Sequence, residues 1–122
     1  QKLSASYAKA YAFPGGEQAA ALFSEAAKNL DFRQLILTRK AINRVDTEER
    51  LSSLEVPALV LVGTRPGDFF VDLSRRLAAA LNTQPILLEG AMDPSNLTAT
   101  PEFDRHVLAF ISSHGNGNNR HE

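Results

Sequence analysis

The chain has 122 residues, about the length of one domain, and it is 43% hydrophobic and 22% charged, which is typical of globular rather than disordered proteins. Its formal net charge is −1, so it has no excess of positive charge to attract the phosphate groups of a nucleic acid. This argues against nucleic acid as a partner. It has no Cys, which excludes disulfides and thiolate metal sites, and no apolar run reaches the roughly 20 residues that cross a bilayer. We therefore expect a soluble protein without membrane contact, with a cytoplasmic location as the default.

Helical patterns fill the first half of the chain. The Pro14-Gly15-Gly16 cluster predicts a turn, and the segment 17–29 then places apolar residues on one helix face. The residues of that face are Ala20, Phe23, Ala27 and Leu30. We expect an amphipathic helix over this segment.

Two further helices are predicted before residue 55. One runs from about Phe32 to Arg44 with Asp31 as its N-cap. Its expected buried side consists of Leu35, Ile36, Ile42 and Val45. The other is short, with Asp46 and Glu49 spaced as a capping box and with Leu51 and Leu54 facing inward.

The second half alternates strand and helix patterns. The run 56–62 is continuously apolar apart from Pro57, which indicates a strand buried on both faces. Residues 69–81 then repeat apolar side chains at helical spacing (Phe70, Leu73, Leu77, Leu81). A short strand at 86–88, a loop at 90–100 and a helix at 101–111 with Pro101 in its first turn complete the pattern. The polar segment from Gly115 to Glu122 is predicted to be disordered.

The segment from Leu51 to Ile111 resembles the C-terminal portion of an α/β-hydrolase. The resemblance rests on the phrase Val56-Pro57 leading into the strand, and on the spacing of a closing motif that runs from Gly90 to Phe103 without a break. The residues of this motif are Leu88, Gly90, Ala91, Leu97, Phe103, Leu108 and Phe110. The resemblance implies a helical, cap-like region at 1–50, a hydrolase-like C-terminal segment at 51–113 with parallel strands, and a tail at 114–122.

The resemblance also implies where catalytic residues belong. The family's acid position is carried by Pro66 and its His position by Asp93, and no Gly-x-Ser-x-Gly elbow is present. Because a triad needs a nucleophile, a base and an orienting acid, this chain alone is expected to be non-catalytic although its family consists of hydrolases. Asp68 is a weak substitute acid, and the N-cap of the following helix is its preferred role.

A weak ligand site is the remaining site hypothesis. Gly63, Arg65, Asp68 and Asp93 all fall at the expected C-terminal ends of the two strands, where open α/β sheets bind ligands. A plain turn is the favoured interpretation of the segment 63–68. We expect no cofactor and no metal, because His106, His114 and His121 lack ligand spacing.

The buried strand raises a packing problem. A strand this apolar needs neighbours on both edges, yet only one other strand is predicted. Three outcomes follow: a missing N-terminal hydrolase half completes the sheet, a second copy completes it, or the helix at 17–29 shields the strand. The chain begins at Gln1 rather than Met, so we expect a processed product or a piece of a longer protein. The alternative function is a small-molecule binding or protein-interaction module derived from the hydrolase fold.

Overall fold

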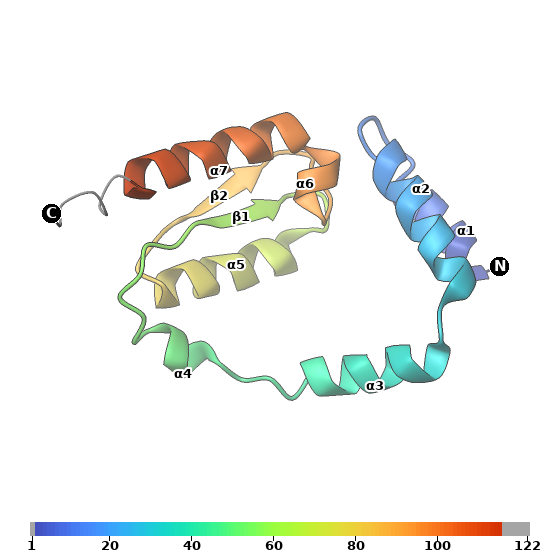
Figure 1. Ribbon diagram of the computed structural model, residues 1–122, viewed down its shortest axis with the longest axis horizontal. Coiled ribbons are helices and arrows are strands. Elements are labelled where there is room, and N and C mark those ends of the chain that lie inside the picture. The colour runs from blue at the N-terminus through green and yellow to red at the C-terminus, as the bar shows by residue number, and fades with distance from the viewer. Residues whose placement is uncertain (1, 116–122) are drawn as a thin grey trace, which may run out of the picture.

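The computed structural model of the protein describes residues 2–115, which form a mixed α/β structure with one two-stranded parallel sheet (Figure 1). In chain order the elements are α1 (Lys2–Ala10), α2 (Glu17–Ala26), the 3₁₀ helix η1 (Ala27–Asn29), α3 (Phe32–Ile42), α4 (Glu48–Leu51), β1 (Val60–Gly63), α5 (Asp68–Ala80), β2 (Pro85–Leu88), α6 (Ser95–Thr98) and α7 (Thr100–His114). No described helix has both the length and the apolar character needed to span a membrane.

Helices α1 and α2 form an antiparallel hairpin that begins the chain. The rings of Tyr7 and Tyr11 both stack on Phe23, each with a centroid distance of 5.5 Å. Ser4 and Ser24 exchange two hydrogen bonds from side-chain hydroxyl to backbone carbonyl, at 3.0 and 3.2 Å. The predicted helix at 17–29 is confirmed, with its last three residues tightened into η1. It packs against α1 and α6 and does not shield the edge of β1.

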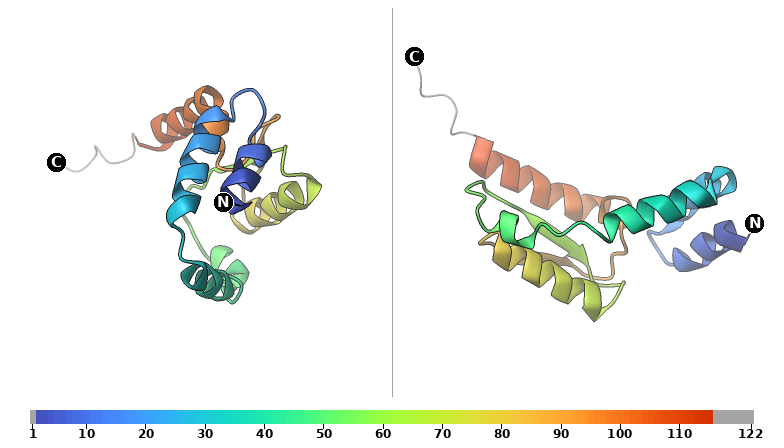
Figure 2. Two further views of the ribbon diagram at one scale, coloured as in Figure 1. Left: turned by 90° about the vertical axis from the view of Figure 1, so that its right-hand side faces the viewer. Right: turned by 90° about the horizontal axis from the view of Figure 1, so that it is seen from below.

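Helix α3 was predicted correctly as a helix but wrongly as a buried one. The Asp31 carboxylate accepts hydrogen bonds from the backbone N–H groups of Arg33 and Gln34, so the predicted N-cap is confirmed. Its apolar side is open, because Leu35 is 42% exposed and Ile42 is 55% exposed. Figure 2 shows α3 as an arm between the hairpin and α4. The helix periodicity is local, whereas burial requires a partner surface that this arm does not meet.

The short helix α4 differs from its prediction at the N-cap. Thr47 is the N-cap residue and makes no side-chain capping hydrogen bond. The predicted capping box of Asp46 and Glu49 is therefore wrong, since the helix begins one residue too late for Asp46 to cap it. Leu51 is half-buried, whereas Leu54, predicted to face inward, is 45% exposed.

The parallel strands are shorter than the apolar run that predicted them. Val60 pairs with Pro85 and Gly63 pairs with Leu88. The predicted strand start at Val56 is wrong, since β2 offers no residue opposite the segment 56–59 and Pro57 lacks an N–H to donate. Val60 and Val62 are buried and Leu61 is half-buried, in keeping with the expectation of a strand covered on both faces.

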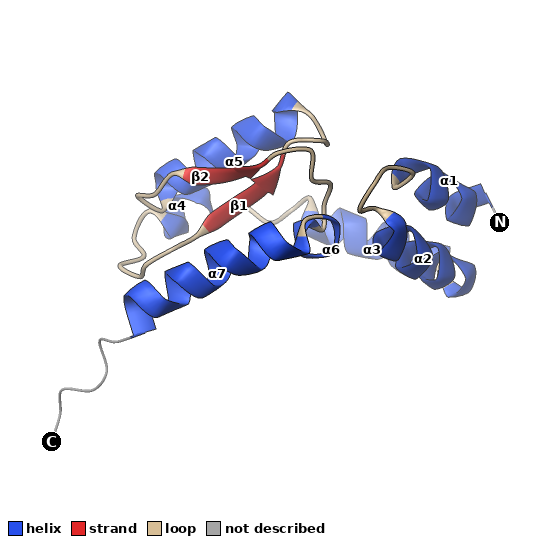
Figure 3. Cartoon of the chain, turned by 90° about the horizontal axis from the view of Figure 1, so that it is seen from above, coloured by secondary structure: helices blue, strands red, loops and turns tan. Residues whose placement is uncertain are grey.

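Two helices cover opposite faces of this small sheet. Figure 3 shows the strands lying between α5 and α7. Val71 and Ala78 of α5 are buried, and Leu88 at the end of β2 is fully buried. The apolar repeat that predicted α5 is largely exposed, since Phe70, Leu73 and Leu77 are between 39% and 49% exposed. The loop predicted at 90–100 contains the four-residue helix α6. Gly115 is the C-cap of α7, and the rest of the predicted disordered tail lies outside the described residues.

The surface of the chain is large for its size. The accessible area is 9518 Å², whereas a folded monomer of 13.3 kDa exposes about 6,500 Å². The eight residues outside the described range account for at most about 1,400 Å² of this difference, on the scaling for an extended chain. About 1,600 Å² of additional surface therefore belongs to the described residues, and many large apolar side chains are exposed on it.

Candidate functional site

The predicted ligand site lies where β1 and β2 end, and its two loops are bonded to each other. The Thr64 N–H donates to the carbonyl of Leu88 at 3.1 Å, and the Arg65 N–H donates to the carbonyl of Ala91 at 3.0 Å. The Thr64 hydroxyl accepts from the Gly90 N–H at 2.8 Å and donates to the Glu89 carboxylate at 3.1 Å. These bonds hold the loop after β1 against the loop after β2.

Gly63 has a packing role at this junction. A Cβ atom on Gly63 would lie 2.3 Å from the Ala91 carbonyl oxygen, far inside van der Waals contact. Gly63 is buried. The glycine therefore permits the close crossing of the second loop, and the space beside it is filled by Ala91 rather than open to a ligand.

Arg65 is fixed by two contacts. Its Nε donates to the Gly90 carbonyl at 3.0 Å, and its guanidinium lies 3.9 Å from the centroid of the Phe13 ring. Phe13 belongs to the turn between α1 and α2, so this cation–π contact joins segments 52 positions apart in the sequence. Sequence reasoning missed Phe13, because nothing local signals which side chain will meet a distant arginine.

A second contact reinforces the same junction. The Tyr11 hydroxyl donates a hydrogen bond to the backbone carbonyl of Asp93. Burial, and then the nearby Tyr7 and Asp93, raise the pKa of Tyr11 above its ordinary value of 10.0. Tyr11 and Phe13 together place the α1–α2 turn over the C-terminal edge of the sheet, where the ligand site was predicted.

The two candidate carboxylates are exposed. Asp68 is the first residue of α5, and its predicted role as N-cap is wrong, because Gly67 occupies that position with φ 101° and no side-chain capping bond. The left-handed φ at the cap favours Gly, so the carboxylate falls one position later, where it still complements the helix dipole. Asp93 is held through its backbone carbonyl.

This junction offers little reactive chemistry. Pro66 has no ionisable group, and no group of three His, Asp or Glu side chains among residues 2–115 is arranged to hold a metal ion. His106 and His114 lie on α7, and the side chains of both form hydrogen bonds with neighbouring residues of that helix. A base poised beside a nucleophile is the requirement for acyl transfer, and the predicted positions provide none.

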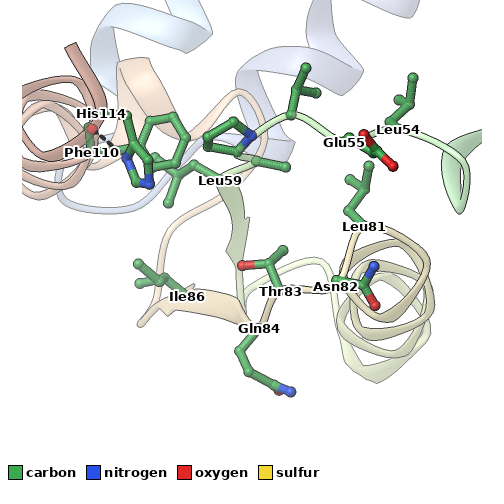
Figure 4. Close-up of a pocket in the computed structure, with 13 residues that line it drawn as sticks. Leu54, Glu55, Leu59, Leu81, Asn82, Thr83, Gln84, Ile86, Phe110 and His114 are labelled. Atoms are coloured by element: carbon green, nitrogen blue, oxygen red, sulfur yellow. Dashed lines mark hydrogen bonds between the residues drawn. The ribbon is translucent and has the colours of Figure 1, made fainter. Parts of the chain in front are cut away.

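A pocket opens at the other end of the sheet, before the strands begin (Figure 4). Its volume is about 470 Å³, and it is formed by the segment 54–59, the segment 81–84, Ile86, Phe110 and His114. Three stretches far apart in sequence build it, so no local motif could have predicted it. The His114 Nδ1 lies 2.9 Å from the Phe110 carbonyl oxygen and 2.9 Å from the Ser113 hydroxyl, which fixes the ring at the pocket wall.

Comparison of the chain with protein-family models, with curated proteins and with solved structures found no match.

Proposed function

We propose that the chain is a non-catalytic, C-terminal portion of an α/β-hydrolase-type fold, and that it works as an assembly unit whose sheet is completed by a second polypeptide. The strand, helix, strand, helix order with parallel strands supports this proposal, as does the placement of α5 and α7 on opposite faces. Parallel sheets covered on both faces normally contain more than two strands.

The observation that carries the proposal is the open edge of β1. The Thr64 N–H donates to the Leu88 carbonyl, so the backbone of Thr64 points toward β2. Every second residue of a parallel strand directs its N–H and C=O groups to the same edge. Val60 and Val62 therefore direct their backbone groups toward β2, whereas Leu61 directs its N–H and C=O toward the other edge. An apolar strand with a free edge is a template for another strand.

The substituted positions support the absence of catalysis. Asp93 carries a carboxylate where the family has an imidazole, and the imidazole is the side chain suited to proton transfer near neutral pH. Its carboxylate is exposed. At the positions that the resemblance assigns within the described residues 2–115, a hydrolase mechanism would therefore lack both its base and its nucleophile.

Two measurements test the proposal. We expect no turnover of a nitrophenyl ester above the buffer rate, and Asp93→Ala should leave that result unchanged. We also expect the Leu61 amide to exchange rapidly with solvent in dilute solution, where no second chain is bound. Ester turnover that Asp93→Ala abolishes, or a strongly protected Leu61 amide in a proven monomer, contradicts the proposal.

A second candidate is small-molecule binding at the 470 Å³ pocket of Figure 4, whose size suits a small ligand. Thermal shift screening tests it: a ligand of this pocket should raise the melting temperature of the wild type and not of Ile86→Trp, which fills the pocket. Equal stabilisation of both proteins places the ligand elsewhere.

A further inference from the structure

The two outer edges of the sheet differ in their capacity to accept a strand. In β2, Ile86 and Leu88 face β1, so Pro85 and Leu87 direct their backbones outward. Pro85 has no N–H to donate, which is a common device of strands that end a sheet. The outward positions of β1 carry no Pro and no charge. The edge of β1 is therefore the one suited to pairing.

We infer that the polypeptide that completes the sheet is a second copy of this chain, paired through β1 in antiparallel orientation. The inference rests on the proposed function, because it names the partner that the open edge requires. A two-fold axis perpendicular to the sheet generates an antiparallel pair, in which every contact between two different residues occurs twice.

The sequence of β1 is self-complementary in this arrangement. With the axis at Leu61, the two Leu61 residues form a hydrogen-bonded pair, and Leu59 of one copy pairs with Gly63 of the other. The backbone N–H and C=O groups of these residues point away from β2. The hydrogen bonds to β2 and the hydrogen bonds to the second copy can therefore form at the same time. Residues 58–63 are uncharged, and no like charges meet across the axis.

Apolar side chains flank this edge. The right-hand view of Figure 2, from below, shows α4 and α3 on the same side of the sheet as β1. Leu51, Leu73 and Leu77 line a hollow of about 210 Å³ between α4 and α5, and α3 presents its exposed Leu35 and Ile42. If two copies pair through β1, apolar helix surface of the second copy would lie against these side chains. Backbone hydrogen bonds between the two strands would not by themselves remove the side chains from water.

The exposed area fits an obligate dimer. If each copy buries its additional surface of about 1,600 Å², the pair buries about 3,200 Å², within the range of permanent interfaces. The formal net charge of −1 per chain provides little long-range repulsion between copies.

The experiment uses the full chain over a concentration series. Light scattering behind a sizing column gives the mass, and residue-resolved amide exchange follows Leu61 and Leu87. We expect a dimer, with protection of the Leu61 amide that increases with concentration while the Leu87 amide stays unprotected. Leu61→Pro should raise the dimer dissociation constant about tenfold or more, since it removes two symmetric outward donors. Leu87→Pro is the matched control, with the same change at an outward position of β2, and should leave dimerisation unchanged.

The possible failures are distinct. A monomer at every concentration with rapid Leu61 exchange overturns the second copy as partner but leaves the proposed open edge intact. A monomer with a slowly exchanging Leu61 amide overturns both. A dimer whose Leu61 exchange is independent of concentration, or one weakened by Leu87→Pro and not by Leu61→Pro, places the interface elsewhere and overturns the inference. The exchange measurement on the wild type decides the matter even where a proline variant fails to fold.

Discussion

The guanidinium of Arg65 lies 3.9 Å from the centroid of the Phe13 ring, and this pair joins the helical hairpin to the end of the parallel sheet. The Arg65 Nε also donates a hydrogen bond to the Gly90 carbonyl. One side chain therefore connects the α1–α2 turn, the loop after β1 and the loop after β2. The α1–α2 turn is thereby held at the edge where a ligand was expected.

Phe13→Ala should weaken this junction. A cation–π contact near the surface contributes about 0.5–1 kcal/mol, and loss of a half-buried ring adds packing, so we expect a decrease of about 1–2 kcal/mol in the free energy of unfolding. Urea denaturation measures it. Phe69→Ala is the matched control, because Phe69 is 72% exposed and its loss should change stability by less than about 0.5 kcal/mol. Equal effects of the two variants would show that the Phe13 contact does not stabilise the fold.

Gly63→Ala should be strongly destabilising. The added Cβ would lie 2.3 Å from the Ala91 carbonyl oxygen, and separating the two loops should cost about 2 kcal/mol or more. Gly90→Ala is the comparison, since nothing lies within 4 Å of its Cβ and only its φ of +70° opposes the change, at about 1 kcal/mol. Chemical denaturation of both variants tests the order of the two effects.

Tyr11→Phe should have an effect that depends on pH. Because the folded state raises the pKa of Tyr11, its contribution to stability is fully present below pH ~10, the ordinary value, and is lost as the pH rises through the folded pKa. At pH 8 the variant should lose about 1 kcal/mol, the typical contribution of the hydrogen bond to Asp93. The difference between wild type and variant should shrink above pH ~10, as followed by urea denaturation at each pH. A difference that stays constant to high pH would contradict the assigned shift.

Asp31→Ala should shorten or fray α3. Its carboxylate accepts two backbone N–H groups at the helix start, and loss of such a cap costs about 1 kcal/mol. Because α3 has little packing, the loss should appear as faster amide exchange within α3 and lower helicity more than as a lower melting temperature. Asp46→Ala, at the aspartate that was wrongly expected to cap α4, should leave the amide exchange of α4 unchanged.

Local patterns in the sequence determined most of the elements. Helical spacing at 17–29, 32–44 and 69–81 predicted α2, α3 and α5, and Asp31 marked a helix start correctly. The run around Val60 predicted a strand, and the alternation with helices predicted a parallel sheet. These signals are readable because helix periodicity and capping depend on residues within about one turn of each other.

Tertiary structure decided the rest. It left the apolar faces of α3 and α5 in solvent, because burial depends on a partner surface that no spacing rule specifies. It began β1 at Val60, opposite the first residue of β2, since a strand persists only opposite a neighbour. It also brought Tyr11 and Phe13 over the sheet edge to meet Asp93 and Arg65. The sequence alone determined most of the segments that fold into helices and strands, whereas long-range packing decided where β1 begins and which helix faces are covered.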